Sequence, residues 1–216
     1  MASDNLYRST IKMSQNHSYI STTYHESGHV VIGLLMYMRV SNVFVVKDRL
    51  ISGATHYEVI EQEQSKNIDI SEYLAKSDIF LSYAGYIAEK KLYKDITGSN
   101  VFPKVLKNGI EQDLSQAHTI IISNNMAPPG KKRYQFKKRM MNKTAGILEK
   151  HWDVVKIVAH ELFENKKLSY EELKKVICRK THNKKFWKKQ FAYIQKFNKN
   201  KQLDAKDIKL LINSTL

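Results

Sequence analysis

The feature that most restricts the fold of this chain is an apolar stretch that carries three ionisable side chains near its start. Residues 21–38 read STTYHESGHVVIGLLMYM, and His25, Glu26 and His29 fit the pattern H-E-x-x-H. Six apolar residues between positions 30 and 36 continue the stretch, so it predicts a buried helix. The run is too short to cross a membrane, and Arg39 closes it.

Buried histidine and glutamate side chains are costly unless something compensates them, and a metal ion is one such compensation. Two histidines four residues apart lie on one face of a helix, with Cβ atoms roughly 5–6 Å apart. This separation lets both imidazoles bind one zinc ion at about 2.0–2.1 Å. Glu26 lies one step round the helix and can take a proton from a zinc-bound water. We therefore predict that His25 and His29 are zinc ligands and that Glu26 is the catalytic base.

The third ligand is not fixed by spacing. A catalytic zinc ion takes three protein ligands and keeps one position open for water. The candidates on other elements are His56, Glu89, Glu111, Asp113, His118, His160 and Glu161. The segment HELFE, which begins at His160, lacks a second histidine four residues on and fits an ordinary helix. Asp113 lies near the start of a predicted helix, where the helix dipole stabilises a carboxylate without any metal.

Composition places the chain among compact intracellular proteins. Its 216 residues suggest one domain, or one domain with an appendage, and 8 Gly and 3 Pro favour helix over long loops. The single cysteine, Cys178, excludes an intrachain disulfide and fits a reducing compartment. Residues 1–20 are polar and do not read as a signal peptide, and no segment has the length of a membrane span. We expect a cytoplasmic protein.

The periodicity of the sequence predicts a mainly α fold with a small β-element beside the active-site helix. Residues 1–19 read as a flexible segment, 94–108 as an irregular connection, and 61–69 as a polar loop. The β-branched and aromatic runs 41–48 and 53–60 predict two strands. We expect helices over residues 22–38 with Ser21 or Thr22 as N-cap, 70–93, 109–126, 136–164, a helix after the N-cap Ser169, and two segments within 184–215.

Four stretches resemble, in the right order, the FtsH-type peptidases, which are the protease domains of membrane-anchored AAA+ zinc proteases. TTYHESGHVVIG resembles the zinc-site helix, and SGATHYEVI resembles the strand that follows it. FLSYAGYIAEKKLY resembles the family's Gly-Arg-x-Ala-Glu-Glu helix, with Gly85, Ala88 and Glu89 in register. GIEQDLSQAHTI resembles its Gly-x-x-x-Asp-Leu-x-x-Ala element, with Gly109, Asp113, Leu114 and Ala117 in register. The resemblance covers roughly residues 20–178, and it leaves 179–216 as a basic helical extension.

The resemblance implies a helical zinc metallopeptidase domain in which Asp113 is the third zinc ligand. Tyr86, Lys90 and Asn108 depart from the family's usual Arg, second acid and Thr, which concerns local packing or subunit contacts rather than the ligands. No G-x-x-x-x-G-K-[ST] loop is present, so the chain resembles the peptidase domain alone. The family's protease domains form rings when tethered to their ATPase, which makes a homo-oligomer one expectation.

The expected reaction is zinc-dependent, ATP-independent hydrolysis of peptide bonds in unfolded or flexible polypeptides. The extended residues Ala54, Thr55, His56 and Tyr57 are the expected substrate-binding strand, which would pair with the substrate backbone. Such pairing selects extended chains, so folded substrates would need delivery by a separate ATPase or chaperone partner.

The positive charge is unevenly placed and suggests a second function. Of a net +15, residues 179–216 hold 11 Lys and Arg against 2 Asp, and a second focus is KKRYQFKKR at 131–139. Lysines interleaved with aromatic residues in 183–202 suit a nucleic-acid strand or an anionic membrane surface. Phe186, Phe191, Ile194 and Phe197 recur at helical spacing, which indicates burial and favours a solvated lysine face on a small helical appendage. The alternative function is a catalytically weak or inactive zinc-binding adaptor that docks to anionic partners through its basic C-terminal region.

Overall fold

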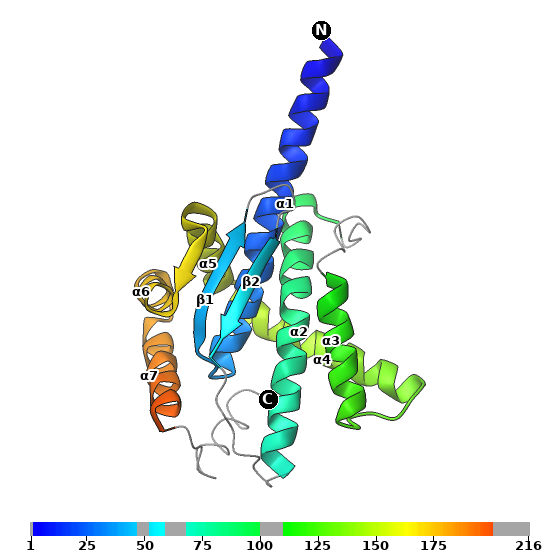
Figure 1. Ribbon diagram of the computed structural model, residues 1–216, viewed down its shortest axis with the longest axis vertical. Helices are drawn as coiled ribbons and strands as arrows, with labels where there is room; N and C mark the ends of the chain where they lie inside the picture. The colour runs from blue at the N-terminus through cyan, green and yellow to red at the C-terminus, as the bar shows by residue number, and fades with distance from the viewer. Residues whose placement is uncertain (1, 47–51, 59–67, 100–109, 201–216) are drawn as a thin grey trace.

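The computed structural model describes residues 2–46, 52–58, 68–99 and 110–200, and it confirms a mainly helical fold with a small sheet (Figure 1). The described residues form seven helices and three strands. In chain order these are α1 (Ala2–Leu35), β1 (Val40–Val46), β2 (Ser52–Tyr57), α2 (Ile68–Thr97), α3 (Ile110–Ser123), α4 (Lys131–Lys150), α5 (Trp152–Asn165), β3 (Lys167–Ser169), α6 (Tyr170–Lys180) and α7 (Lys184–Asn200).

The C-terminal half of α1 forms the centre of the hydrophobic core. It packs against α2 and α5, and strands β1 and β2 lie across it. Val30, Val31, Ile32 and Leu34 have no exposed surface, as expected for a helix that is apolar on all sides. Every polar group on this part of α1 must therefore find a partner inside the protein.

The sheet is antiparallel, with the strand order β2-β1-β3. Val43 of β1 pairs with Thr55 of β2 on one side and with Leu168 of β3 on the other. The two predicted strands are confirmed, although β2 ends at Tyr57 rather than at residue 60. The three-residue strand β3 was not predicted, because so short a segment has no periodicity to read. Strand β2 lies at one edge of the sheet.

Helix α1 is longer than expected and begins at Ala2, where the sequence predicted a flexible segment over residues 1–19. Its N-terminal half extends away from the other elements (Figure 1). No Gly or Pro interrupts residues 1–27, so nothing local ends the helix at position 21. The predicted N-caps Ser21 and Thr22 therefore lie inside the helix, and the N-cap prediction is wrong.

The single helix predicted over residues 136–164 is two helices, α4 and α5, which meet at His151. The backbone of His151 leaves helical geometry at φ −117° and ψ 22°. Helix α4 packs mainly against α2, whereas α5 packs mainly against α1. The apolar periodicity thus continues through both helices, but the helix against which it packs changes from α2 to α1. Periodicity alone does not reveal such a change.

The C-terminal helices confirm two predictions. Ser169 caps α6 in a capping box with Glu172, as its position before the helix predicted. Helix α7 buries Trp187, Phe191 and Phe197 in the same core as α1, so its interleaved aromatic residues face inward.

Several expectations lie outside the described residues: the loop at 61–67, most of the connection before α3 with Asn108 and Gly109, and the last helical segment after residue 200. None of the helices in the described part of the chain combines the length and the apolar character that a bilayer crossing requires.

Candidate metal centre

Three side chains from two helices converge on one point. The Nε2 atoms of His25 and His29, both on α1, are 3.0 Å apart. The Oδ2 atom of Asp113, in the first turn of α3, lies 3.1 Å from the former and 3.2 Å from the latter. In the described part of the chain, these three residues form the one cluster of His, Cys, Asp or Glu side chains whose ligand atoms lie close enough together to hold a metal ion. Of the seven candidates for a third ligand, the structure brings Asp113 to the histidine pair.

The hydrogen bonds on the far side of each imidazole fix which nitrogen faces the centre. His25 Nδ1 lies 2.6 Å from Glu89 Oε1, and His29 Nδ1 lies 3.0 Å from the backbone carbonyl of Leu81. Each Nδ1 thus faces an acceptor oxygen, and a neutral imidazole that donates through Nδ1 has its Nε2 lone pair available at the centre. Asp113 Oδ2 is buried and accepts no hydrogen bond of good geometry from a described group. Three atoms that can each supply an electron pair to a cation therefore lie at one point.

Electrostatics at this point favour positive charge. Burial disfavours the charged imidazolium, but the contacts with Asp113 and Glu89 outweigh it and raise the pKa of His25 to about 10. Burial likewise opposes ionisation of Asp113, yet the two imidazoles hold the pKa of its carboxyl well below its usual range. Surroundings that stabilise a proton this strongly also stabilise a cation. Two imidazole nitrogens and a carboxylate oxygen form a donor set that suits a divalent transition metal or zinc.

Glu89 contacts the outer nitrogen of His25 and does not face the point at which the three side chains converge. Its Oε2 atom accepts a hydrogen bond of 2.6 Å from the hydroxyl of Ser21, one turn before His25 on α1. A carboxylate that binds the outer nitrogen of a ligand histidine fixes the tautomer and the orientation of its ring. Sequence reasoning had Glu89 among the candidate ligands and missed Ser21. The available signal was an acidic residue on the apolar, core-facing side of α2.

Glycine residues allow α1 and α2 to approach closely enough for these contacts. A Cβ atom on Gly28 would lie 2.6 Å from the carbonyl oxygen of Ala84. A Cβ atom on Gly85 would overlap the imidazole of His25. The absence of these two side chains lets Glu89, one turn after Gly85, reach His25.

Glu26 points from α1 toward strand β2. Its Oε2 atom accepts a hydrogen bond of 2.7 Å from the hydroxyl of Thr55, and the side chain is buried. Gly53 makes room for it, since a Cβ atom there would lie 2.7 Å from Glu26 Cγ. The predicted base is therefore held in place by the strand that was predicted to bind substrate.

The four residues of that strand have different roles. Thr55 contacts Glu26, and the Tyr57 hydroxyl donates to the backbone carbonyl of His29 over 2.9 Å. Burial raises the pKa of Tyr57 well above its usual value, so its hydroxyl stays a donor. His56 is exposed and lies edge-on to Phe44, with ring centroids 5.4 Å apart. Ala54 is half-buried. Thr55 and Tyr57 thus tie β2 to the helix that carries the histidines.

The remaining candidates lie away from this group. Glu161 of α5 forms an ion pair with Lys180, and Glu111 is exposed on α3. His56 faces solvent on β2. His118 lies on α3 more than one turn after Asp113, and His160 is exposed on α5, as expected for an ordinary helix.

No protein-family model matches the chain, and no curated protein is significantly similar to it in sequence. The interpretation of the centre therefore depends on its own geometry and on the physical chemistry of its donors.

Proposed function

We propose that this chain is a zinc-dependent metalloendopeptidase of the H-E-x-x-H class, similar to an FtsH-type peptidase domain. The observation that carries the proposal is the convergence of His25 Nε2, His29 Nε2 and Asp113 Oδ2 on one point. A carboxylate, Glu26, lies on the same helix next to the first of these ligands.

The proposed mechanism divides the work among named residues. His25 and His29 would hold zinc through Nε2 and Asp113 through Oδ2, while Glu89 keeps the His25 ring in position. When bound, such an ion acts as a Lewis acid on the scissile carbonyl and lowers the pKa of water to about 7. Glu26, oriented by Thr55, takes a proton from the attacking water and delivers it to the leaving amine.

The proposed substrate is an extended, flexible polypeptide. Strand β2 is an edge of the sheet, and an extended peptide can add to such an edge through backbone hydrogen bonds. Because Thr55 of this strand contacts Glu26, a chain bound along β2 would pass close to the base. Folded proteins do not offer such a segment, so a separate ATPase or chaperone would have to supply them.

The test replaces Glu26 in the full chain and measures metal content and hydrolysis separately. Glu26→Gln should keep zinc, measured by elemental analysis, and should lose hydrolysis of casein by about 10²–10⁴-fold, the usual contribution of a general base. Glu164→Gln, an exposed carboxylate on α5, is the matched control and should behave as the parent chain. Undiminished hydrolysis by Glu26→Gln would refute the proposed base.

A second candidate function, from another class, is a zinc-holding adaptor without peptidase activity. It is favoured by the exposed positions of α7, which are rich in lysine, including Lys184, Lys185, Lys188 and Lys189, while Trp187, Phe191 and Phe197 of that helix are buried. Hydrolysis of casein that a chelator abolishes would decide for the peptidase. A zinc-loaded chain that leaves casein intact would decide for the adaptor.

A further inference from the structure

Helix α4 carries a row of positive charge that the proposed peptidase mechanism does not use. Between Lys131 and Leu148 it contains seven Lys and Arg and no Asp or Glu. The cations span Lys131 to Lys143, which is about 18 Å along the helix axis at about 1.5 Å per residue. Burial chiefly, and the neighbouring Arg133 in addition, lower the pKa of Lys137. A row of this length fits an extended polyanion better than a single ion.

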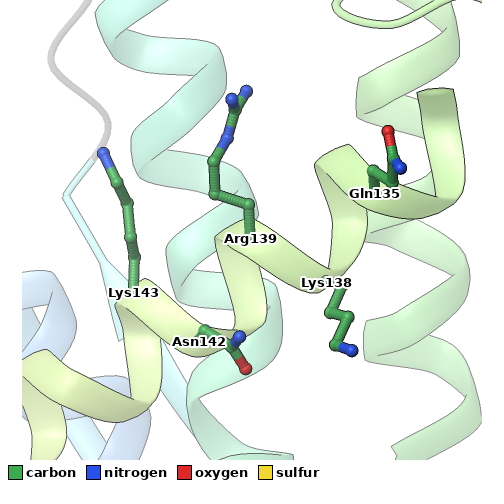
Figure 2. A pocket seen from close by; sticks show the side chains of 5 residues that line it. All are labelled: Gln135, Lys138, Arg139, Asn142 and Lys143. Atoms are coloured by element: carbon green, nitrogen blue, oxygen red, sulfur yellow. The ribbon is translucent and has the colours of Figure 1, made fainter.

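Two adjoining hollows lie along this row. The first, of about 440 Å³, is lined by five side chains on successive turns of α4: Gln135, Lys138, Arg139, Asn142 and Lys143 (Figure 2). The second, of about 520 Å³, lies between α4 and α2 and shares Asn142 with the first. The two hollows thus form one continuous surface, which we call the α2–α4 groove.

The second hollow adds aromatic rings and further cations. Tyr86 and Tyr93 of α2 line it together with Lys90 and Lys94. Its acidic residues, Asp95 and Glu149, both form ion pairs with Lys91, so with three lysines this hollow keeps a net charge of +1, and the three cations of the first hollow bring the groove to +4. Tyr134 lines neither hollow, but it lies one turn before Lys138 on the same face of α4 and is 68% exposed. Positive charge beside exposed and half-buried aromatic rings is the combination that single-stranded nucleic acids bind, through their phosphates and their unstacked bases.

We propose that the α2–α4 groove binds single-stranded nucleic acid, independently of the metal centre on α1 and α3. A membrane surface fits less well, because a helix that lies in a bilayer interface needs a band of exposed apolar residues. The described part of α4 has no such band, because Tyr134 alone among its large hydrophobic residues is exposed. Duplex DNA fits less well too, since its stacked bases do not present their faces to the tyrosines.

The test measures binding of a fluorescent oligo-dT of about 20 nucleotides to the full chain by polarisation, from about 50 to about 200 mM salt. The triple variant Lys138→Glu, Arg139→Glu, Lys143→Glu should weaken binding at least about tenfold. Replacement of the same three residues by Gln, which spares the fold from new charge repulsion, should lower the slope of log K against log salt by about 2. Tyr134→Ala should weaken binding severalfold, because each stacked base contributes.

The matched control carries the same charge change elsewhere: Lys156→Glu, Lys167→Glu, Lys175→Glu, all at exposed positions outside the groove. Its affinity should stay within about threefold of the parent chain. Equal losses in control and groove variants would overturn the proposal, since binding would then follow net charge alone. A loss confined to Lys184→Glu, Lys185→Glu, Lys188→Glu would overturn it in favour of α7. Tight binding to phosphatidylserine vesicles without binding to the oligonucleotide would overturn it in favour of a membrane.

Discussion

The metal centre and the α2–α4 groove both concentrate ionisable side chains, but they do so in opposite ways. In the centre, atoms from residues 25, 29 and 113 lie within 3.2 Å of one another, and each imidazole has a further partner that fixes its ring. In the groove, most of the cations are exposed, and they follow two helices, α2 and α4, over several turns. Converging donors suit a single ion, and a row of like charges suits a polymer. The centre should therefore depend steeply on each residue, whereas the groove should depend on the sum of its charges.

The largest effect is expected from the third member of the centre. Asp113→Ala should lower zinc affinity by more than about 100-fold, because even groups behind the ligands contribute about 10–100-fold. A competition titration with a zinc-binding dye measures the change. Glu111→Ala removes an exposed carboxylate from the same turn of α3 and should leave the affinity unchanged. Full affinity in Asp113→Ala would show that another residue completes the site.

The residue behind His25 should have the next largest effect. Glu89→Gln keeps the shape of the side chain but removes the charge that orients the imidazole, so zinc affinity should fall about 10–100-fold. Ser21→Ala removes only the hydrogen bond to Glu89 and should cost less. The same titration on both variants gives the order. A larger loss for Ser21→Ala than for Glu89→Gln would contradict the chain of contacts.

Alanine substitutions at two glycines compare how well the two regions tolerate an added methyl group. Gly85→Ala would place a methyl group against the His25 ring and should destabilise the fold by about 1–3 kcal/mol. Gly146 lies within α4 beside the groove, where a Cβ atom would meet nothing within 4 Å. Gly146→Ala should stabilise the fold by about 0.5–1 kcal/mol. Urea unfolding of both variants measures the difference, and equal effects would remove the contrast between a packed site and an open one.

The smallest effect concerns a histidine outside both regions. His151 stacks on Phe186, and burial lowers its pKa, an effect that Asp153 opposes and Lys150 reinforces. The fold thus prefers the neutral ring. Its contribution to stability is complete above the unfolded pKa of about 6.5 and is lost as the pH falls through the lower folded value.

His151→Phe should therefore lose less stability than the parent chain between about pH 7.5 and about pH 5. Urea unfolding at the two pH values measures this difference, in which the titration of other groups cancels. The same pH dependence in both chains would show that His151 does not contribute.

The sequence was sufficient to predict the features that depend on spacing within one helix. The distance of four residues between His25 and His29, the apolar run after them and the capping box at Ser169 all follow from the geometry of one helix. The third member of the centre did not follow from spacing, which left seven candidates. Asp113 came from a resemblance, and its position beside the histidines agrees with that choice. The peptidase activity itself stays a prediction.

What the sequence did not reveal depends on contacts between distant segments. Ser21, Glu89 and His25 meet only because Gly28 and Gly85 let two helices approach, and no single window contains all of them. The break at His151 arises because α4 and α5 pack on different helices. Strand β3 exists because β1 offers a free edge to three residues that have no pattern of their own.

The amide of Gln190 in α7 donates hydrogen bonds of 2.8 Å and 3.3 Å to the carbonyls of Leu34 and Leu35, the last residues of α1. The lysine-rich end of the chain is thereby fastened to the helix that bears the two histidines. A protease that clipped the chain between α6 and α7 would expose Trp187 and Phe191 and loosen that final turn. Loss of α7 would thereby disturb the helix on which His25 and His29 lie, although the cut itself falls far from them in the sequence.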